Sequence, residues 1–187
     1  MKSVKQVLIE WVDLCIRLEI RYVVMDGLAV RIHGIPRPTY DVDLTIAVDQ
    51  QQLQQLFVDA ERIGYTVSDA YKSGWMDRVA EMPIVKLRTW LQDGKGIDVD
   101  LFVCESVFQN SLIDRGIECQ FESRKLTVVS PEDLVLLKLL ANRPQDIGDV
   151  QDVLFMQGQL DEAYMRHWAE QLNITDRLSA ALEINSN

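Results

Sequence analysis

Two aspartates, Asp41 and Asp43, stand two positions apart in a segment where apolar and polar residues alternate. In an extended strand such residues project from the same face, separated along it by about twice the 3.3 Å rise per residue. A second segment repeats the pattern with Asp98 and Asp100. Carboxylate oxygens suit Mg²⁺, which is commonly held by one or two carboxylates together with substrate phosphates. If the two segments are neighbouring strands, three carboxylates suit two metal ions and an in-line displacement that releases pyrophosphate.

A lone Asp-x-Asp pair is usually just the solvated face of an amphipathic strand, so other features are needed. Asp26 and Gly27 form a tight turn before a short apolar helical segment. The free N–H groups and the positive dipole end of such a helix can receive a phosphate group. The alternative is structural, because aspartate is also a common N-cap residue.

The segments that must position these residues mix helices and strands. Apolar residues at three- and four-residue spacing predict helices, and alternation of apolar and polar residues predicts strands. Residues 65–82 show no clear pattern. The predicted elements are helices over 3–19, 28–32 and 50–64, and strands over 21–25, 41–48, 84–91, 97–103 and 125–129, with a hairpin loop over 92–96.

The last third of the chain is predicted to be helical. Ser130 followed by Pro131 supplies an N-cap and a first-turn proline, and Glu132 and Asp133 place negative charge in the first turn. The expected fold class is α+β, a small mixed β-sheet core flanked by helices, with a C-terminal helical tail. The core is expected over residues 1–129 and a helical extension packed on it over 130–187. The predicted helices of this part cover 134–141, 145–157, 161–172 and 175–184.

Composition narrows the class of protein. The formal net charge of -10 disfavours an extended surface for nucleic acid, which would need a local basic patch. Three separated cysteines without metal-ligand spacing are interpreted as buried reduced thiols, which fits a cytoplasmic location. No signal peptide is visible, and no run reaches the roughly 18 to 20 apolar residues of a membrane span. We therefore expect a soluble, cytoplasmic protein that does not bind membranes.

Taken together, the motifs resemble the signature of the nucleotidyltransferase superfamily, which has a DNA polymerase beta-like fold. Residues 25–30 read Met-Asp-Gly-Leu-Ala-Val, and residues 33–44 read His-Gly-Ile-Pro-Arg-Pro-Thr-Tyr-Asp-Val-Asp-Leu. They are similar to the bacterial branch that holds abortive-infection-type toxins, whose motif reads Gly-Gly-x-Ala, His-Gly, Pro-Arg-x-Thr and Asp-x-Asp. The resemblance covers about residues 20–155 and is more specific for the fold than for the substrate.

This resemblance implies roles for individual residues. Asp41 and Asp43 would hold the metals, and Asp100 would be the third ligand or the base that takes a proton from the acceptor. Asp98 is the alternative third carboxylate, because strand alternation puts both on one face. The nucleotide-binding residues implied by the family pattern are Gly27, Arg37, Thr39 and Lys138.

Some of these positions also have structural interpretations. Arg37 either holds phosphate oxygens or pairs with a nearby carboxylate, and Lys138 either reaches the NTP phosphates or lies on the surface with its stem buried. Three further polar residues of the family pattern are expected to join the helical tail to the catalytic sheet. These are Arg143, Asp146 and Asp149.

The implied function is a metal-dependent nucleotidyltransferase that uses Mg²⁺ or Mn²⁺ to move an NMP from an NTP, such as ATP, to a hydroxyl of an acceptor. The acceptor is a tRNA or RNA end or a small molecule, and the toxin resemblance adds a toxin role and an antitoxin partner. Asp26 departs from the motif, because a small residue is usual there. A carboxylate at this position could cap the helix and repel the triphosphate. This departure favours the alternative, a catalytically weakened family member that acts as a protein-binding module.

Overall fold

The structure is a computed structural model that describes residues 2–90, 94–122 and 124–185. Side-chain caps set where several helices begin. α1 (Val4–Arg17) and α3 (Gln50–Arg62) each start with a capping box, in which the N-cap side chain accepts from the N3 backbone and the N3 side chain returns a bond. α6 (Pro131–Ala141) begins after Ser130, whose hydroxyl accepts from the Asp133 N–H, as the sequence predicts.

In the described part of the chain, eight strands form one mixed sheet, with the order β3-β5-β6-β2-β1-β8-β7 and β4 paired to β5. β2 pairs with β6 in parallel, β1 pairs with β8 in parallel, and the other pairs are antiparallel. The mixed α+β fold expected from the sequence is confirmed. The strands are β1 (Arg21–Met25), β2 (Asp41–Ala47), β3 (Tyr65–Val67), β4 (Asp77–Val79), β5 (Met82–Trp90), β6 (Gly96–Val103), β7 (Ile117–Phe121) and β8 (Arg124–Val128).

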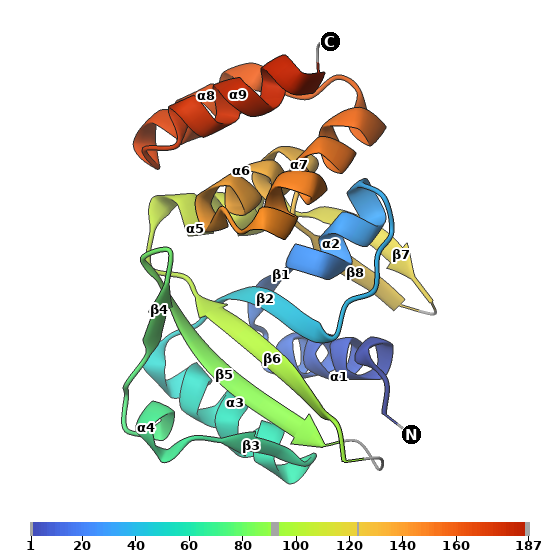
Figure 1. Cartoon of the computed structure of the whole chain (residues 1–187). Coiled ribbons are helices and arrows are strands. Elements are labelled where there is room, and N and C mark those ends of the chain that lie inside the picture. Colours follow the sequence, from blue (N-terminus) through green and yellow to red (C-terminus); the bar gives the residue numbers. More distant parts are fainter. Residues whose placement is uncertain (1, 91–93, 123, 186–187) are drawn as a thin grey trace.

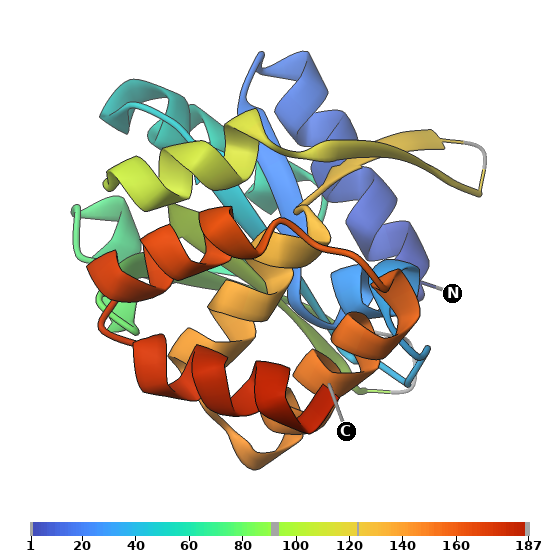
Figure 2. The ribbon, with the colours of Figure 1, turned by 90° about the horizontal axis from the view of Figure 1, so that it is seen from above.

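The helices cover the two faces of the sheet unequally. α1 and α3 lie together on one face, as Figures 1 and 2 both show. The other face carries the remaining long helices, with α8 and α9 farthest from the sheet (Figure 1). The helices not yet given bounds are α2 (Asp26–His33), α4 (Asp69–Lys72), α5 (Val107–Asp114), α7 (Pro144–Gln157), α8 (Glu162–Gln171) and α9 (Thr175–Asn185).

The alternation in β2 has the consequence that the sequence predicts. Val42, Leu44 and Ile46 are fully buried on the face covered by α1. The residues between them therefore point to the opposite face, toward α2 and the C-terminal helices. A shift of β2 by one residue would move this apolar row out of the core, so its burial fixes the register of the strand. The positions of Asp41 and Asp43 are thus tied to the core.

The structure differs from the sequence prediction in several places. α2 begins at Asp26, two residues before the predicted segment, and the unassigned region over 65–82 contains β3, α4 and β4. α5 and β7 were not predicted. Residues 91–93, which fall in the predicted strand end and hairpin loop, lie outside the described residues. Cys15 is buried, but Cys104 and Cys119 are only half-buried, so the prediction of three buried thiols is wrong for two of them.

Within the described residues, no helix has the length and apolar composition needed to cross a membrane. The helices α6 to α9 follow the last strand, as expected for the C-terminal tail. α6 packs against α2, so the first of these helices belongs to the surroundings of the carboxylate face. The division of the chain at residue 130 stays a prediction.

Candidate nucleotidyl transfer site

The register of β2 and β6 aligns four carboxylates in two rows. Asp43 lies opposite Asp100, and Asp41 lies opposite Asp98. All four side chains leave the same face of the sheet, because the members of each pair are two residues apart on their strand. The two carboxylates of β2 therefore lie beside the two carboxylates of β6.

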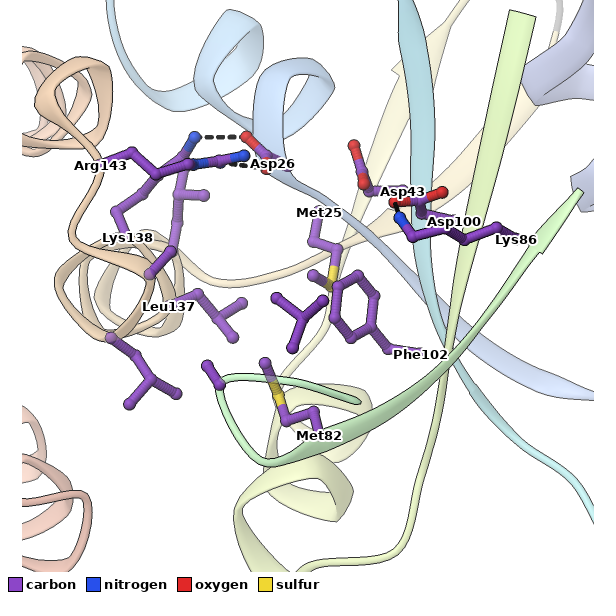
Figure 3. A pocket seen from close by; sticks show the side chains of 15 residues that line it. Met25, Asp26, Asp43, Met82, Lys86, Asp100, Phe102, Leu137, Lys138 and Arg143 are labelled. Carbon is purple, nitrogen blue, oxygen red and sulfur yellow. Dashed lines mark hydrogen bonds and ion pairs between the residues drawn. The ribbon is translucent and has the colours of Figure 1, made fainter. Parts of the chain in front are cut away.

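The next strand, β5, separates the two candidates for the third carboxylate. Arg88 lies opposite Asp98 and binds both of its carboxylate oxygens, with 2.7 Å between Nη2 and Oδ2. Lys86 lies opposite Asp100 and forms an ion pair with it. The Asp98 side chain is 46% exposed and the Asp100 side chain 20%. Asp100 is the more buried of the two and lies beside Asp43 (Figure 3).

Asp43 is the most confined member of this group. Its side chain is buried, and we find no hydrogen bond or ion pair to its carboxylate in the described ranges. Burial, followed by the charges of Asp26, Asp41 and Asp100, raises the pKa of Asp43 well above its ordinary value. Burial also raises the pKa of Asp100, although Lys86 opposes the change. A cation placed between these carboxylates would relieve the repulsion that raises the pKa of Asp43.

Asp26 does not cap α2, so this interpretation of the sequence is wrong. The N-cap residue is Met25, and no side chain accepts a hydrogen bond from the first turn. Asp26 has a φ of 52°, in the left-handed region that non-glycine residues rarely adopt. Its carboxylate is directed instead to Lys138 and Arg143, with 2.9 Å between Oδ2 and the Arg143 Nη2 (Figure 3).

Lys138 is a buried internal cation and not a surface lysine. It is 2% exposed, and its Nζ lies 3.0 Å from Asp146 and 2.8 Å from Asp149, besides its ion pair with Asp26. Burial alone would lower the pKa of Lys138, but the three carboxylates raise it. Oxygens of the three carboxylates lie within 4.8 Å of one another, a spacing consistent with a divalent metal site. In this structure the Lys138 ammonium supplies the positive charge that this acidic cluster needs.

Arg37 also pairs with a carboxylate. Its Nε and Nη2 donate to the two oxygens of Asp149, both at 2.8 Å. Arg143, the N-cap of α7, donates from Nη2 to Asp26 of α2 at 2.9 Å and from Nε to Asp146 at 2.7 Å. Arg143 and Asp149 thus connect the helical tail to α2 and to the loop after α2, whereas Asp146 contacts other residues of the tail.

Two hollows meet at the Asp26–Arg143 ion pair, which borders both. The first, of about 460 Å³, is lined by Asp43, Asp100 and apolar residues of the sheet and α6, and we call it the inner pocket. The second, of about 690 Å³, lies over Gly27 and Asp41, and we call it the outer basin. The other residues that line the outer basin are Asp26, Arg37, Pro38, Thr39, Tyr40, Arg143, Pro144 and Gln145.

The chain matches the family model described as "Nucleotidyltransferase of unknown function (DUF6036)" over residues 9–182. It belongs to this nucleotidyltransferase family. No curated protein matches the chain. The fold agrees with the family.

Solved nucleotidyltransferase structures share this fold. An antigenic nucleotidyltransferase-like protein from Paracoccidioides brasiliensis has a TM-score of 0.55 at 18% identity, over 96% of this chain and 92% of that chain. ANT(2")-Ia in complex with adenylyl-2"-tobramycin has a TM-score of 0.57 at 11% identity, over 90% and 96%. The lincosamide antibiotic adenylyltransferase LnuA, with lincomycin bound, has a TM-score of 0.50 at 19% identity, over 78% and 93%. At these identities the likeness concerns the fold alone.

Gly27 lies against Thr39, in the loop that follows α2. A Cβ atom there would be 2.6 Å from Thr39 Oγ1 and 2.9 Å from Thr39 Cβ. The Thr39 hydroxyl in turn donates to Asp41 Oδ1 at 2.8 Å. Any side chain at position 27 would therefore displace a residue that orients a carboxylate of the site.

We expect Gly27→Ala to destabilise the protein by about 1–3 kcal/mol, the usual cost of inserting a methyl group into a packed contact. Gly148→Ala is the matched control, because Gly148 is in the middle of α7 and a Cβ there meets nothing within 4 Å. The control should be neutral or stabilising, by up to about 1 kcal/mol from helix propensity. Urea unfolding of both variants measures the difference, and equal stabilities would contradict the assigned contact.

Proposed function

We propose that this chain is a metal-dependent nucleotidyltransferase that moves an NMP from an NTP to a hydroxyl group of an acceptor. The observation that supports this most is the buried Asp43 carboxylate between Asp41 and Asp100, without a hydrogen-bond partner among the described residues. A purely structural role would leave this repulsion uncompensated. A divalent ion bound there would compensate the repulsion, since Mg²⁺ is commonly held by one or two carboxylates together with substrate phosphates.

The three carboxylates have the donor chemistry that Mg²⁺ or Mn²⁺ requires, since all their ligand atoms are oxygens. Asp41 and Asp43 would hold the metals, with Asp100 as the third ligand or as the base. When bound, such ions activate the attacking hydroxyl and stabilise the departing pyrophosphate.

The remaining roles follow from the positions of the side chains. Gly27 borders the outer basin at the start of α2, where the N–H groups without a side-chain cap and the helix dipole favour phosphates. Thr39 holds Asp41 by its hydroxyl. We assign Arg37 and Lys138 to the ion pairs that position Asp26 and α7, in place of direct contacts to the phosphates.

In the reaction, the acceptor oxygen forms a bond to the α-phosphorus. The bond from the α-phosphorus to the oxygen that bridges the α- and β-phosphates breaks, and pyrophosphate leaves with the electron pair. The proton of the hydroxyl passes to Asp100, whose raised pKa makes it a better base than an ordinary aspartate. Positioning and charge neutralisation supply the catalysis, without a covalent protein intermediate.

The loop motif and the net charge bear on the acceptor class and the biological role. The loop motif favours a tRNA or RNA end and a toxin role with an antitoxin partner, whereas the net charge of -10 favours a small or cationic molecule. One structural neighbour is named a lincosamide antibiotic adenylyltransferase, so transfer to a small molecule occurs within this fold. The toxin role stays a prediction of the motif.

The rival function, a protein-binding module, was suggested by Asp26. In the structure, Lys138 and Arg143 neutralise its carboxylate. The repulsion of a triphosphate by Asp26 is therefore smaller than the sequence suggests. This pairing removes the main physical argument for the weakened alternative.

The test is calorimetric titration of each NTP with Mn²⁺ into the wild type, Asp43→Asn and Asp98→Asn. Asp98→Asn is the matched control, because Asp98 shares the face and lies outside the inner pocket. We expect metal-dependent binding of at least one NTP to the wild type and the control, and its loss in Asp43→Asn. Absence of NTP binding by the folded wild-type protein would sink the proposal.

A further inference from the structure

The inner pocket has a chemical character different from that of the outer basin. Met25, Met82 and Phe102 line it from the sheet, and Leu134, Leu137 and Leu140 line it from α6. Figure 3 shows Met82 on the side of the pocket away from Asp26 and Asp43. The pocket is thus apolar in its body and carboxylate-bearing at one edge.

The two hollows divide the carboxylates between them. Asp41 borders the outer basin, Asp100 borders the inner pocket with Asp43, and Asp26 borders both. The outer basin also contains Gly27 and the start of α2, the region suited to phosphate. A molecule in the inner pocket would therefore reach Asp43 and Asp100 from a different hollow than a triphosphate in the outer basin.

The charged residues that line the inner pocket balance one another. Three carboxylates (Asp26, Asp43 and Asp100) face three cations, so their formal charges sum to zero. Each cation is already held by a carboxylate: Lys86 by Asp100, Lys138 by Asp26, and Arg143 by Asp26 and Asp146. No lining cation of the inner pocket is therefore free to bind the phosphates of an RNA strand, which dominate the affinity of proteins for nucleic acid.

The same balance of charges in the inner pocket disfavours a polycationic acceptor. If Asp43 holds a metal ion, Asp26 and Asp100 are the remaining lining carboxylates, and they are engaged by Lys138 and Arg143 and by Lys86. An ammonium group in this pocket would lack a partner and would cost desolvation free energy. The two methionines, by contrast, adapt to the shape of an apolar ligand.

We infer that the acceptor is a small molecule with an uncharged, apolar body and a hydroxyl group, bound in the inner pocket with the hydroxyl at Asp100. The inference rests on the proposed function and names its acceptor class. The volume of about 460 Å³ falls in the range of pockets for drug-sized ligands. The hydroxyl reacts at the α-phosphorus as described above, so no further reactant is needed.

The first experiment uses N-phenyl-1-naphthylamine, a neutral apolar fluorophore, as the probe. Ala141 is exposed on α6 and lines the inner pocket, so Ala141→Phe should narrow the pocket without disturbing the core. Ala180→Phe, at an exposed position of α9, is the matched control. We expect saturable probe binding by the wild type and the control, at least tenfold weaker binding by Ala141→Phe, and equal NTP binding by all three. Loss of NTP binding in Ala141→Phe would assign the pocket to the nucleotide and overturn the inference.

The second experiment follows transfer of label from α-³²P-labelled NTPs with Mn²⁺. The acceptors are offered separately as butanol-soluble metabolites of a cell extract, as total RNA and as the polycation tobramycin. Labelling of the butanol-soluble pool, reduced at least tenfold by Ala141→Phe and unchanged by Ala180→Phe, is the expected result. Labelling of RNA or tobramycin alone would overturn the inference and leave the proposed function standing. Absence of metal-dependent NTP binding by the wild type would instead remove the proposed function itself.

Discussion

Asp43→Asn is expected to lower nucleotidyl transfer by about 10³-fold, the scale of losing one preorganised electrostatic group at the reacting centre. The substitution keeps the size of the side chain and removes its charge. Asp43 lies between Asp41 and Asp100, so its loss leaves the two remaining carboxylates without the ligand that joins them. Release of pyrophosphate measures the rate, and Asp98→Asn should retain activity close to that of the wild type.

The same substitution should stabilise the metal-free protein at neutral pH. Burial and the neighbouring carboxylates raise the pKa of Asp43, so its ionised form is unfavourable in the fold. We expect a rise in the melting temperature of about 2–4 °C, which corresponds to about 1 kcal/mol in a protein of this size. Mn²⁺ should raise the melting temperature of the wild type and not that of the variant. A variant less stable than the metal-free wild type would contradict the assigned repulsion.

The pH dependence of this stabilisation has a defined sign. Above the ordinary carboxyl pKa of about 4 and below the raised folded-state pKa, the folded protein binds a proton that the unfolded chain does not. The contribution of Asp43 to stability therefore decreases as the pH rises through the folded-state pKa, and the penalty is fully present above it. The stability difference between Asp43→Asn and the wild type should shrink as the pH falls toward about 4. Melting temperatures across this range measure it.

Lys138→Met is expected to cause the largest loss of stability, about 3–5 kcal/mol, because it leaves buried carboxylates without their cation. Lys138 is 2% exposed and joins α6 to Asp26, Asp146 and Asp149. Methionine preserves the unbranched shape, so lost packing contributes little. Urea unfolding gives the difference in the free energy of unfolding.

Lys86→Met is the control for this prediction, since it removes a half-exposed lysine from a single ion pair with Asp100. Such a pair contributes about 0–1 kcal/mol. The spacing of the three carboxylates around Lys138 adds a second readout. A divalent ion should replace the missing ammonium in Lys138→Met, so Mn²⁺ should raise the melting temperature of this variant more than that of the wild type. Equal losses in the two lysine variants would contradict the role of Lys138 as the internal cation.

Interactions close in the sequence could be predicted well. The alternation in β2 depends on neighbouring residues, and it correctly places Asp41 and Asp43 on one face. The start of α6 at Ser130 and Pro131 likewise depends on a local cap. β7 was not found because it is an edge strand whose residues are exposed or only half-buried, which leaves little apolar alternation to detect.

The choice between Asp98 and Asp100 depended on the tertiary structure. Both are on the same face of β6, so the period of the strand treats them alike. Only the pairing with β2 and β5, together with the position of α6, leaves Asp98 with Arg88 and puts Asp100 in the inner pocket.

The role of Asp26 likewise depended on the tertiary structure. By sequence alone it resembles a helix cap, because aspartate before a helix often is one. In the folded chain its carboxylate meets Lys138, 112 residues later. The sequence by itself determined the strands and helices with clear local spacing and the faces on which the carboxylates lie, but not β3, β4, β7, α4 or α5. The tertiary structure decided which charges meet, because contacts between distant residues depend on how whole elements pack.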